Sequence, residues 1–117
     1  MTEVQKRLPA VFYQTRRGNE VVLDWLRSLD VEDRRRIGFD LKDVEYGWPM
    51  GMPLCRSLGN GLWEVRSNIS HGRIARLIFC IKDDHIVVLH GFVKKTQKTP
   101  KSDLDLAMHR KKEIDQW

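Results

Sequence analysis

The chain has little of what disulfide-bonded, secreted or membrane-spanning proteins require. Only two cysteines occur among its 117 residues, Cys55 and Cys80, and they form no CxxC pair, so a disulfide framework is not indicated. No run approaches the roughly 20 apolar residues that span a bilayer, and residues 1–6 lack the apolar core of a signal peptide. We therefore expect a cytoplasmic protein without a membrane partner.

Patterns that bind metals or cofactors are also missing from the sequence. The four histidines have no zinc-ligand spacing, either with one another or with the two cysteines. The acidic pair Asp83-Asp84 lies between two strand-like runs, where a turn explains it better than a magnesium site. We therefore expect no cofactor and no metal, and any chemistry that the chain performs is predicted to be metal-free.

Acidic residues are scarce between residues 47 and 82. The net charge is +5, but residues 19–46 carry five basic and eight acidic side chains, a net −3. Residues 47–82 carry five basic and one acidic side chain, and residues 94–117 carry seven basic and four acidic ones. A basic excess gathered in this way indicates a polyanionic partner such as a nucleic acid, although a solvated basic surface would give the same composition.

Hydrophobic periodicity predicts one strand and two helices in the first half. Residues 10–15 alternate as a short strand does. The apolar stripe of an amphipathic helix is formed by Val22, Trp25, Leu26 and Leu29. A second helix is predicted to begin after Asp30, an N-cap residue, and to end at residues 47–53, which hold two prolines and two glycines.

The second half changes to a strand-like pattern and ends in a helix. The three strand-like runs are residues 61–69, 73–81 and 85–93. A last helix is predicted from residues 99–100, with Leu104, Ala107 and Met108 as its inner face. The order β-α-α-β-β-β-α predicts a single α+β domain over residues 1–117, with two helices packed on a small, mainly antiparallel sheet and a short C-terminal helix.

Strand parity places two arginines side by side. Alternation along the first of the three runs puts Glu64 and Arg66 on one face. If residues 70–72 form a three-residue loop, Arg66 and Arg76 stand opposite one another on neighbouring strands. Like charges so placed destabilise a sheet unless an anion lies between them, and guanidinium groups suit phosphate. We therefore predict a phosphate clamp; the alternative is that Glu64 or Asp43 pairs with one arginine.

Further basic and titratable residues surround this predicted clamp. Lys94, Lys95 and Lys98 follow the last strand, and a lysine crowded by other cations can acquire the pKa of a proton donor or acceptor. The alternative is a solvated basic loop that only contacts phosphates. His71 lies in the predicted turn close to Arg73 and is a candidate phosphate or acid–base group. His90, in an apolar strand, is either an RNA contact or a hydrogen-bonded structural histidine.

Three segments of the chain strongly resemble the phage-derived, HigB-like branch of the RelE/ParE toxin superfamily. They are residues 62–66 (LWEVR), 73–79 (RIARLIF) and 89–100 (LHGFVKKTQKTP). The resemblance extends over roughly residues 10–114, and the last segment is its most specific part. The order of predicted elements agrees with the fold that the resemblance implies.

The resemblance implies a type II toxin that cuts mRNA on the ribosome. Its catalytic residues would be Arg66, Arg76, Lys94 and Lys95, and its RNA-binding residues Arg73, His71, Lys98 and His90. The implied partners are mRNA, the ribosome and a cognate antitoxin with a helix-turn-helix, and operator DNA would be bound only through the antitoxin complex. The chain departs from RelE in having no tyrosine near its C-terminus, since its two tyrosines are Tyr13 and Tyr46. A general-base or stacking role given to such a tyrosine therefore has no owner here, unless Trp117 or a lysine takes it.

Two other functions fit the same residues. A ParE-like toxin would use the basic face to bind DNA gyrase without cutting RNA. A passive nucleic-acid-binding module would show salt-dependent binding without toxicity.

Overall fold

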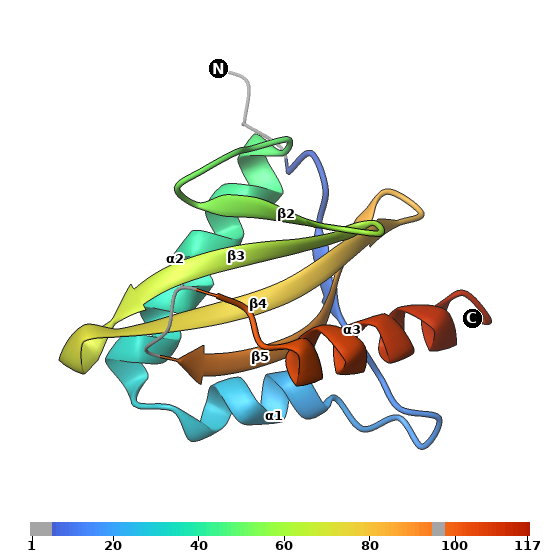
Figure 1. Cartoon of the computed structure of the whole chain (residues 1–117), viewed down its shortest axis with the longest axis horizontal. Helices are drawn as coiled ribbons and strands as arrows, with labels where there is room; N and C mark the ends of the chain where they lie inside the picture. Colours follow the sequence, from blue (N-terminus) through green and yellow to red (C-terminus); the bar gives the residue numbers. More distant parts are fainter. Residues whose placement is uncertain (1–5, 95–97) are drawn as a thin grey trace.

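The protein consists of a five-stranded sheet with helices on both faces (Figure 1). The structure is a computed structural model that describes residues 6–94 and 98–117, with Lys94 described by its backbone alone. The elements in chain order are β1 (Ala10–Phe12), α1 (Val21–Ser28), α2 (Val31–Gly47), β2 (Cys55–Gly59), β3 (Leu62–Ile69), the 3-10 turn η1 (Ser70–Gly72), β4 (Arg73–Lys82), β5 (His85–Lys94) and α3 (Lys101–Ile114). The strand order is β1-β5-β4-β3-β2. None of the helices within residues 6–94 and 98–117 combines the length and the hydropathy of a membrane-spanning segment.

The α+β class is confirmed, but the predicted order of elements lacked one strand. The first strand pairs in parallel with β5, and the other three pairings are antiparallel, so the sheet is mixed. The omitted strand is β2, an edge strand of sequence CRSLG. Because it has no β-branched or aromatic residue and follows a Gly- and Pro-rich segment, its composition does not identify it as a strand. The corrected order is β-α-α-β-β-β-β-α.

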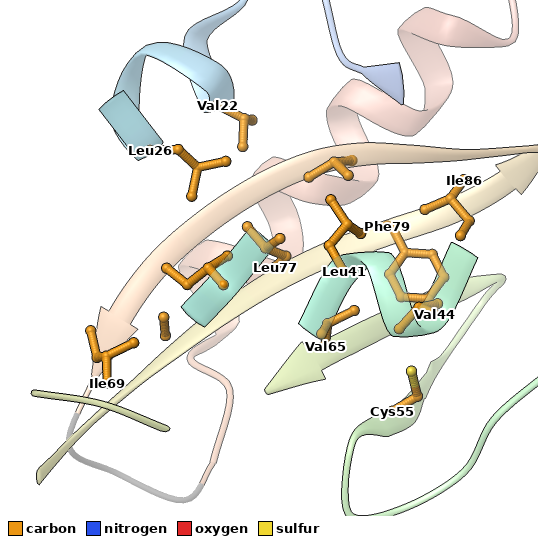
Figure 2. Packing of buried hydrophobic residues seen from close by; sticks show 13 residues of the cluster. Val22, Leu26, Leu41, Val44, Cys55, Val65, Ile69, Leu77, Phe79 and Ile86 are labelled. Carbon is orange, nitrogen blue, oxygen red and sulfur yellow. The ribbon is translucent and has the colours of Figure 1, made fainter. Parts of the chain in front are cut away.

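Alternate strand residues build a separate hydrophobic cluster on each face of the sheet. On one face, side chains of α1 and α2 such as Leu26 and Val44 pack against Val65, Leu77 and other strand residues (Figure 2). On the other face, α3 contributes a second set, which comprises Ala107 and Ile114 with the partly buried Leu104 and Met108. The predicted inner face of the last helix is therefore confirmed, and α1 and α2 pack on the sheet as expected.

The turn between β3 and β4 has the predicted length. Residues 70–72 form η1, where His71 and Gly72 have positive φ angles of 62° and 67°. Ile69 pairs with Arg73, and Arg66 therefore pairs with Arg76. The predicted register is confirmed, because the three-residue turn keeps the strand parity on which it was based.

Helix α1 packs closely against β5 at Gly91. A Cβ atom added there would lie 2.5 Å from Cζ3 of Trp25 and 3.0 Å from Cδ2 of Leu77. Trp25 is a rigid ring that packs against the first hydrophobic cluster, so it cannot easily move away. A glycine at this position is therefore required by packing and not by a turn.

We expect Gly91→Ala to destabilise the fold by about 1–3 kcal/mol, because the added methyl group overpacks the contact between α1 and the sheet. Gly38→Ala is the matched control, since a Cβ there meets nothing within 4 Å. In the exposed interior of α2 that change should stabilise the helix by up to about 1 kcal/mol. Urea-unfolding midpoints of the two variants would test this, and a Gly91→Ala protein as stable as the unaltered chain would contradict it.

Candidate functional site

Three arginines and one glutamate share the sheet face on which α3 packs. Arg56 of β2 pairs with Glu64 of β3, and Arg66 of β3 pairs with Arg76 of β4. Directly paired residues of antiparallel strands project from the same face, and positions 64 and 66 also share a face because they are two residues apart. We call these four residues the arginine face.

Arg56 was not among the residues that the sequence analysis selected. Arg56 was missed because β2 was not predicted, and it is β2 that places Arg56 opposite Glu64. One signal was available, since Asn60-Gly61 is a two-residue hairpin sequence between two short runs. Both residues have positive φ angles, 54° and 80°, as such a turn requires. Taking Asn60-Gly61 as a hairpin would have predicted the strand and its arginine.

Arg76 lies inside the protein as part of a buried polar network. The side chains of Arg76 and Glu64 are 0% exposed, and their Nη1 and Oε2 atoms are 3.9 Å apart. The hydroxyl of Thr99, itself buried, donates a hydrogen bond to the same Oε2. Nη1 of Arg76 donates to the Thr99 oxygen at 3.4 Å. The network thereby attaches the segment before α3 to the middle of the sheet.

Burial and neighbouring charges have opposite effects on Arg76. Desolvation lowers the pKa of its guanidinium and the Glu64 carboxylate raises it, while the charges of Arg66 and Arg56 lower it further. Arginine nevertheless keeps its proton in proteins. Arg76 is therefore a buried cation that faces Glu64 and Thr99 in this structure. Its predicted catalytic role stays a prediction.

Arg56 and Arg66 are only half-buried, and neither takes part in an ion pair within the described residues. The one acidic residue of the arginine face, Glu64, interacts with Arg76. The face therefore carries an excess of positive charge at its accessible part. Such an arrangement can bind an anion by charge and by the paired donors of the guanidinium groups.

Arg73 lies on the other face of the sheet and binds α2. Its Nη2 donates to Oδ2 of Asp33 at 2.8 Å, and the same carboxylate accepts bonds from the backbone N–H and hydroxyl of Ser70, each at 3.0 Å. Arg73 also donates to the carbonyl oxygen of Ser70. His71 is exposed at the tip of the turn. The structure therefore does not bring Arg73 to Arg66 and Arg76.

His90 is held by α3. Its Nε2 atom donates to Oδ1 of Asp103 at 2.7 Å, and its ring stacks on Phe92 with the ring centres 5.4 Å apart. Phe92 pairs with Arg76, so His90 and Arg76 lie on the same side of the sheet. The half-buried His90 has the second of the two roles considered from the sequence, that of a hydrogen-bonded structural histidine. Its predicted RNA contact remains untested.

The predicted lysines are only partly described. Lys98 is exposed, and the backbone of Lys94 ends β5 opposite Ile74. The side chain of Lys94 and the whole of Lys95 lie outside the described residues. Within residues 6–94 and 98–117, no group of three His, Cys, Asp or Glu side chains could hold a metal ion.

A cavity of about 660 Å³ lies away from the arginine face. It is formed between β1 with the residues that follow it and the C-terminal end of α3, and its lining includes Phe12, Arg16 and the 60% exposed Trp117. Trp117 follows the end of α3 that is farthest from Thr99 (Figure 1). The structure therefore places Trp117 at this cavity, and not among the residues predicted to bind phosphate.

Replacing Thr99 tests the buried network directly. We expect Thr99→Val to lower the free energy of unfolding by about 1–3 kcal/mol, because the buried carboxylate of Glu64 loses a hydrogen bond. Thr99→Ser keeps the hydroxyl and is the matched control. Chemical unfolding would measure both, and equal stability of the Val and Ser variants would contradict the importance of the hydrogen bond.

The contacts of Asp33 predict a pH-dependent contribution to stability. Hydrogen bonds from Ser70, chiefly from its backbone N–H, together with the charge of Arg73, hold the pKa of Asp33 below its ordinary value of 3.8. A carboxyl group whose pKa is lowered by folding stabilises the protein above its unfolded pKa, and this stabilisation is lost as the pH falls through the folded pKa.

We therefore expect Asp33→Asn to destabilise the protein at neutral pH and to differ progressively less from the unaltered chain as the pH falls below about 3.8. Asp24→Asn, which removes the exposed ion pair with Arg27, should have little effect at any pH. Unfolding free energies measured over a pH series would show this. A difference for Asp33→Asn that stays constant with pH would contradict the prediction.

Comparison with known proteins places the chain in a family. The model of the family described as Phage derived protein Gp49-like (DUF891) matches residues 24–112, which include α2, all of β2 to β5 and most of α3. The comparison with curated proteins found no significant match. The matched segment covers well over half of the chain. The chain therefore belongs to the family of phage-derived Gp49-like proteins, a RelE/HigB-like family of type II toxins.

Proposed function

We propose that this protein is a ribosome-dependent endoribonuclease of the HigB type, which arrests translation by cutting mRNA. The observation that carries the proposal is the arginine face, where two half-buried guanidinium groups outside any described ion pair lie beside a buried third. A cluster of this kind suits the phosphate of a polyanion. Membership of a toxin family supports the proposal, and it implies an antitoxin partner.

The proposed reaction is a transesterification within the RNA. The 2′-oxygen forms a bond to the adjacent phosphorus, and the bond between that phosphorus and the 5′-oxygen breaks. The products are a 2′,3′-cyclic phosphate and a free 5′-hydroxyl. One proton leaves the 2′-hydroxyl and one joins the departing 5′-oxygen, and we assign these transfers to Lys94 or Lys95. A nucleophile that belongs to the ribose explains selection of RNA over DNA.

Arg66 and Arg76 have different tasks in this proposal. Arg66 is accessible and stabilises the negative charge that grows on the phosphate oxygens. Arg76 is buried and acts as a positioning residue, because it holds Glu64 and Thr99 behind the accessible part of the face. Its positive charge adds to the potential at the phosphate without direct contact.

The proposed partners follow from the shape of the site as well as from the family. Neither the cavity at Trp117 nor the smaller one at Gly91 contains a residue of the arginine face, and we propose that another surface orients the RNA. The ribosome would supply this orientation, which is a large part of a rate enhancement. The proposed antitoxin carries a helix-turn-helix, through which the complex would bind operator DNA.

Replacing Arg66 tests the proposal in cells. We expect Arg66→Ala to lower the number of newly formed RNA 5′ ends by about a hundredfold, because removal of one donor to a developing oxyanion typically has an effect of that size. Induction of the protein followed by mapping of 5′-hydroxyl RNA ends measures this. Arg35→Ala removes an exposed arginine of α2, which packs on the opposite face of the sheet, and should leave cleavage unchanged.

Two results would count against the nuclease. One is undiminished cleavage by a folded Arg66→Ala protein. The other is the appearance of DNA breaks while mRNA stays intact, which would identify a ParE-like toxin that acts on gyrase.

A further inference from the structure

The accessible positive charge of the arginine face lies between β2 and β3, one strand away from the pair predicted by sequence. Arg56 pairs with Glu64, and Arg66 is two residues farther along the same strand. Arg56 and Arg66 are therefore diagonal neighbours on one face, a relation in which Cβ atoms are about 7–8 Å apart. Long side chains span that distance easily, so both guanidinium groups can reach one tetrahedral anion.

Glu64 cannot neutralise these two arginines as well as Arg76. Its Oε2 atom interacts with Arg76 and accepts the Thr99 hydrogen bond. Its Oε1 atom is buried and has no hydrogen-bond partner within the described residues. The charges of Arg66 and Arg56 both lower the pKa of Arg76, so each of the two lies within electrostatic reach of that buried guanidinium.

An anion bound between Arg56 and Arg66 would offset this excess of positive charge. Neighbouring like charges raise the energy of the sheet, and an oxyanion between them reverses the sign of the interaction. Guanidinium groups offer forked donors that match the oxygens of phosphate, so two of them can hold one phosphate in a fixed orientation.

We propose that Arg56 is a phosphate-binding residue of this protein, and that it forms with Arg66 a two-arginine site for one RNA phosphodiester. This inference rests on the proposed function for the identity of the anion as RNA, while the anion site itself depends only on the arginine face. The site spans β2 and β3, with Arg76 behind it as the buried group that holds Glu64.

The binding test uses the whole chain and inorganic phosphate. NMR detects the Nε–Hε resonances of arginine side chains, and those of Arg56 and Arg66 should shift saturably with a shared dissociation constant. Arg56→Ala should weaken phosphate binding at Arg66 about tenfold, because a charged donor is lost. Arg56→Lys keeps the charge without the fork and should have an intermediate effect. Arg35→Ala, on the other side of the sheet, should have none.

The inference is overturned if phosphate causes no saturable shift at Arg56 and Arg66 in the unaltered chain. It is also overturned if a folded Arg56→Ala protein binds phosphate at Arg66 as tightly as the unaltered chain does. Unfolding curves of Arg56→Ala and Arg56→Lys show whether each variant is folded, and the Lys variant keeps the test valid if the Ala variant is not.

Mapping of RNA 5′ ends separates this inference from the proposed function. Phosphate binding that depends on Arg56, in a protein that cuts no RNA in cells, would leave the anion site in place and reject the nuclease. If the protein cuts RNA but its Arg66 binds phosphate without help from Arg56, the nuclease is supported and the two-arginine site is rejected. If both hold, Arg56→Ala should lower cleavage in cells about tenfold, in line with its effect on binding.

Discussion

The ion pair between Arg76 and Glu64 is the interaction on which the arrangement of this protein depends. Both side chains are fully buried, and a buried charge that loses its partner costs several kcal/mol. Thr99 forms a hydrogen bond with each partner, so the chain that leads into α3 must return to the middle of the sheet. The hydrogen bond between Asp103 and His90 makes a second polar attachment at the start of α3. The rest of that helix is held by apolar packing and by further hydrogen bonds, such as those from Arg110 to the carbonyl oxygen of Leu89 and from Tyr13 to Glu113.

The two faces of the sheet use their arginines differently. On the face of α1 and α2, Arg73 is bound by Asp33 and ties the turn after β3 to α2. On the face of α3, the single carboxylate of the arginine face is already engaged by Arg76, and positive charge remains at Arg56 and Arg66. An arginine that is paired with a carboxylate thus has a structural role, whereas an arginine without such a partner is available for an anion. This contrast connects the fold with the proposed phosphate site.

Much of the fold and part of the site could be predicted from local sequence patterns. Helical periodicity located α1 and α2, and strand alternation located β3, β4 and β5. An assumed turn of three residues then predicted Arg66 opposite Arg76, because turn type and loop length set the pairing register. Strand β2 was not predicted, since a short edge strand owes its conformation to the neighbour that pairs with it and not to its own side chains.

Composition and periodicity were enough to predict the α+β class and the clustering of basic residues, and an assumed turn of three residues added the pairing of Arg66 with Arg76. The arginines that are accessible could be identified only from the tertiary structure. Burial of Arg76 depends on Glu64 and Thr99, which lie 12 and 23 residues away along the chain, and exposure of Arg66 beside Arg56 depends on an edge strand. Charge can be counted along a sequence, but its solvation is set by contacts between distant segments.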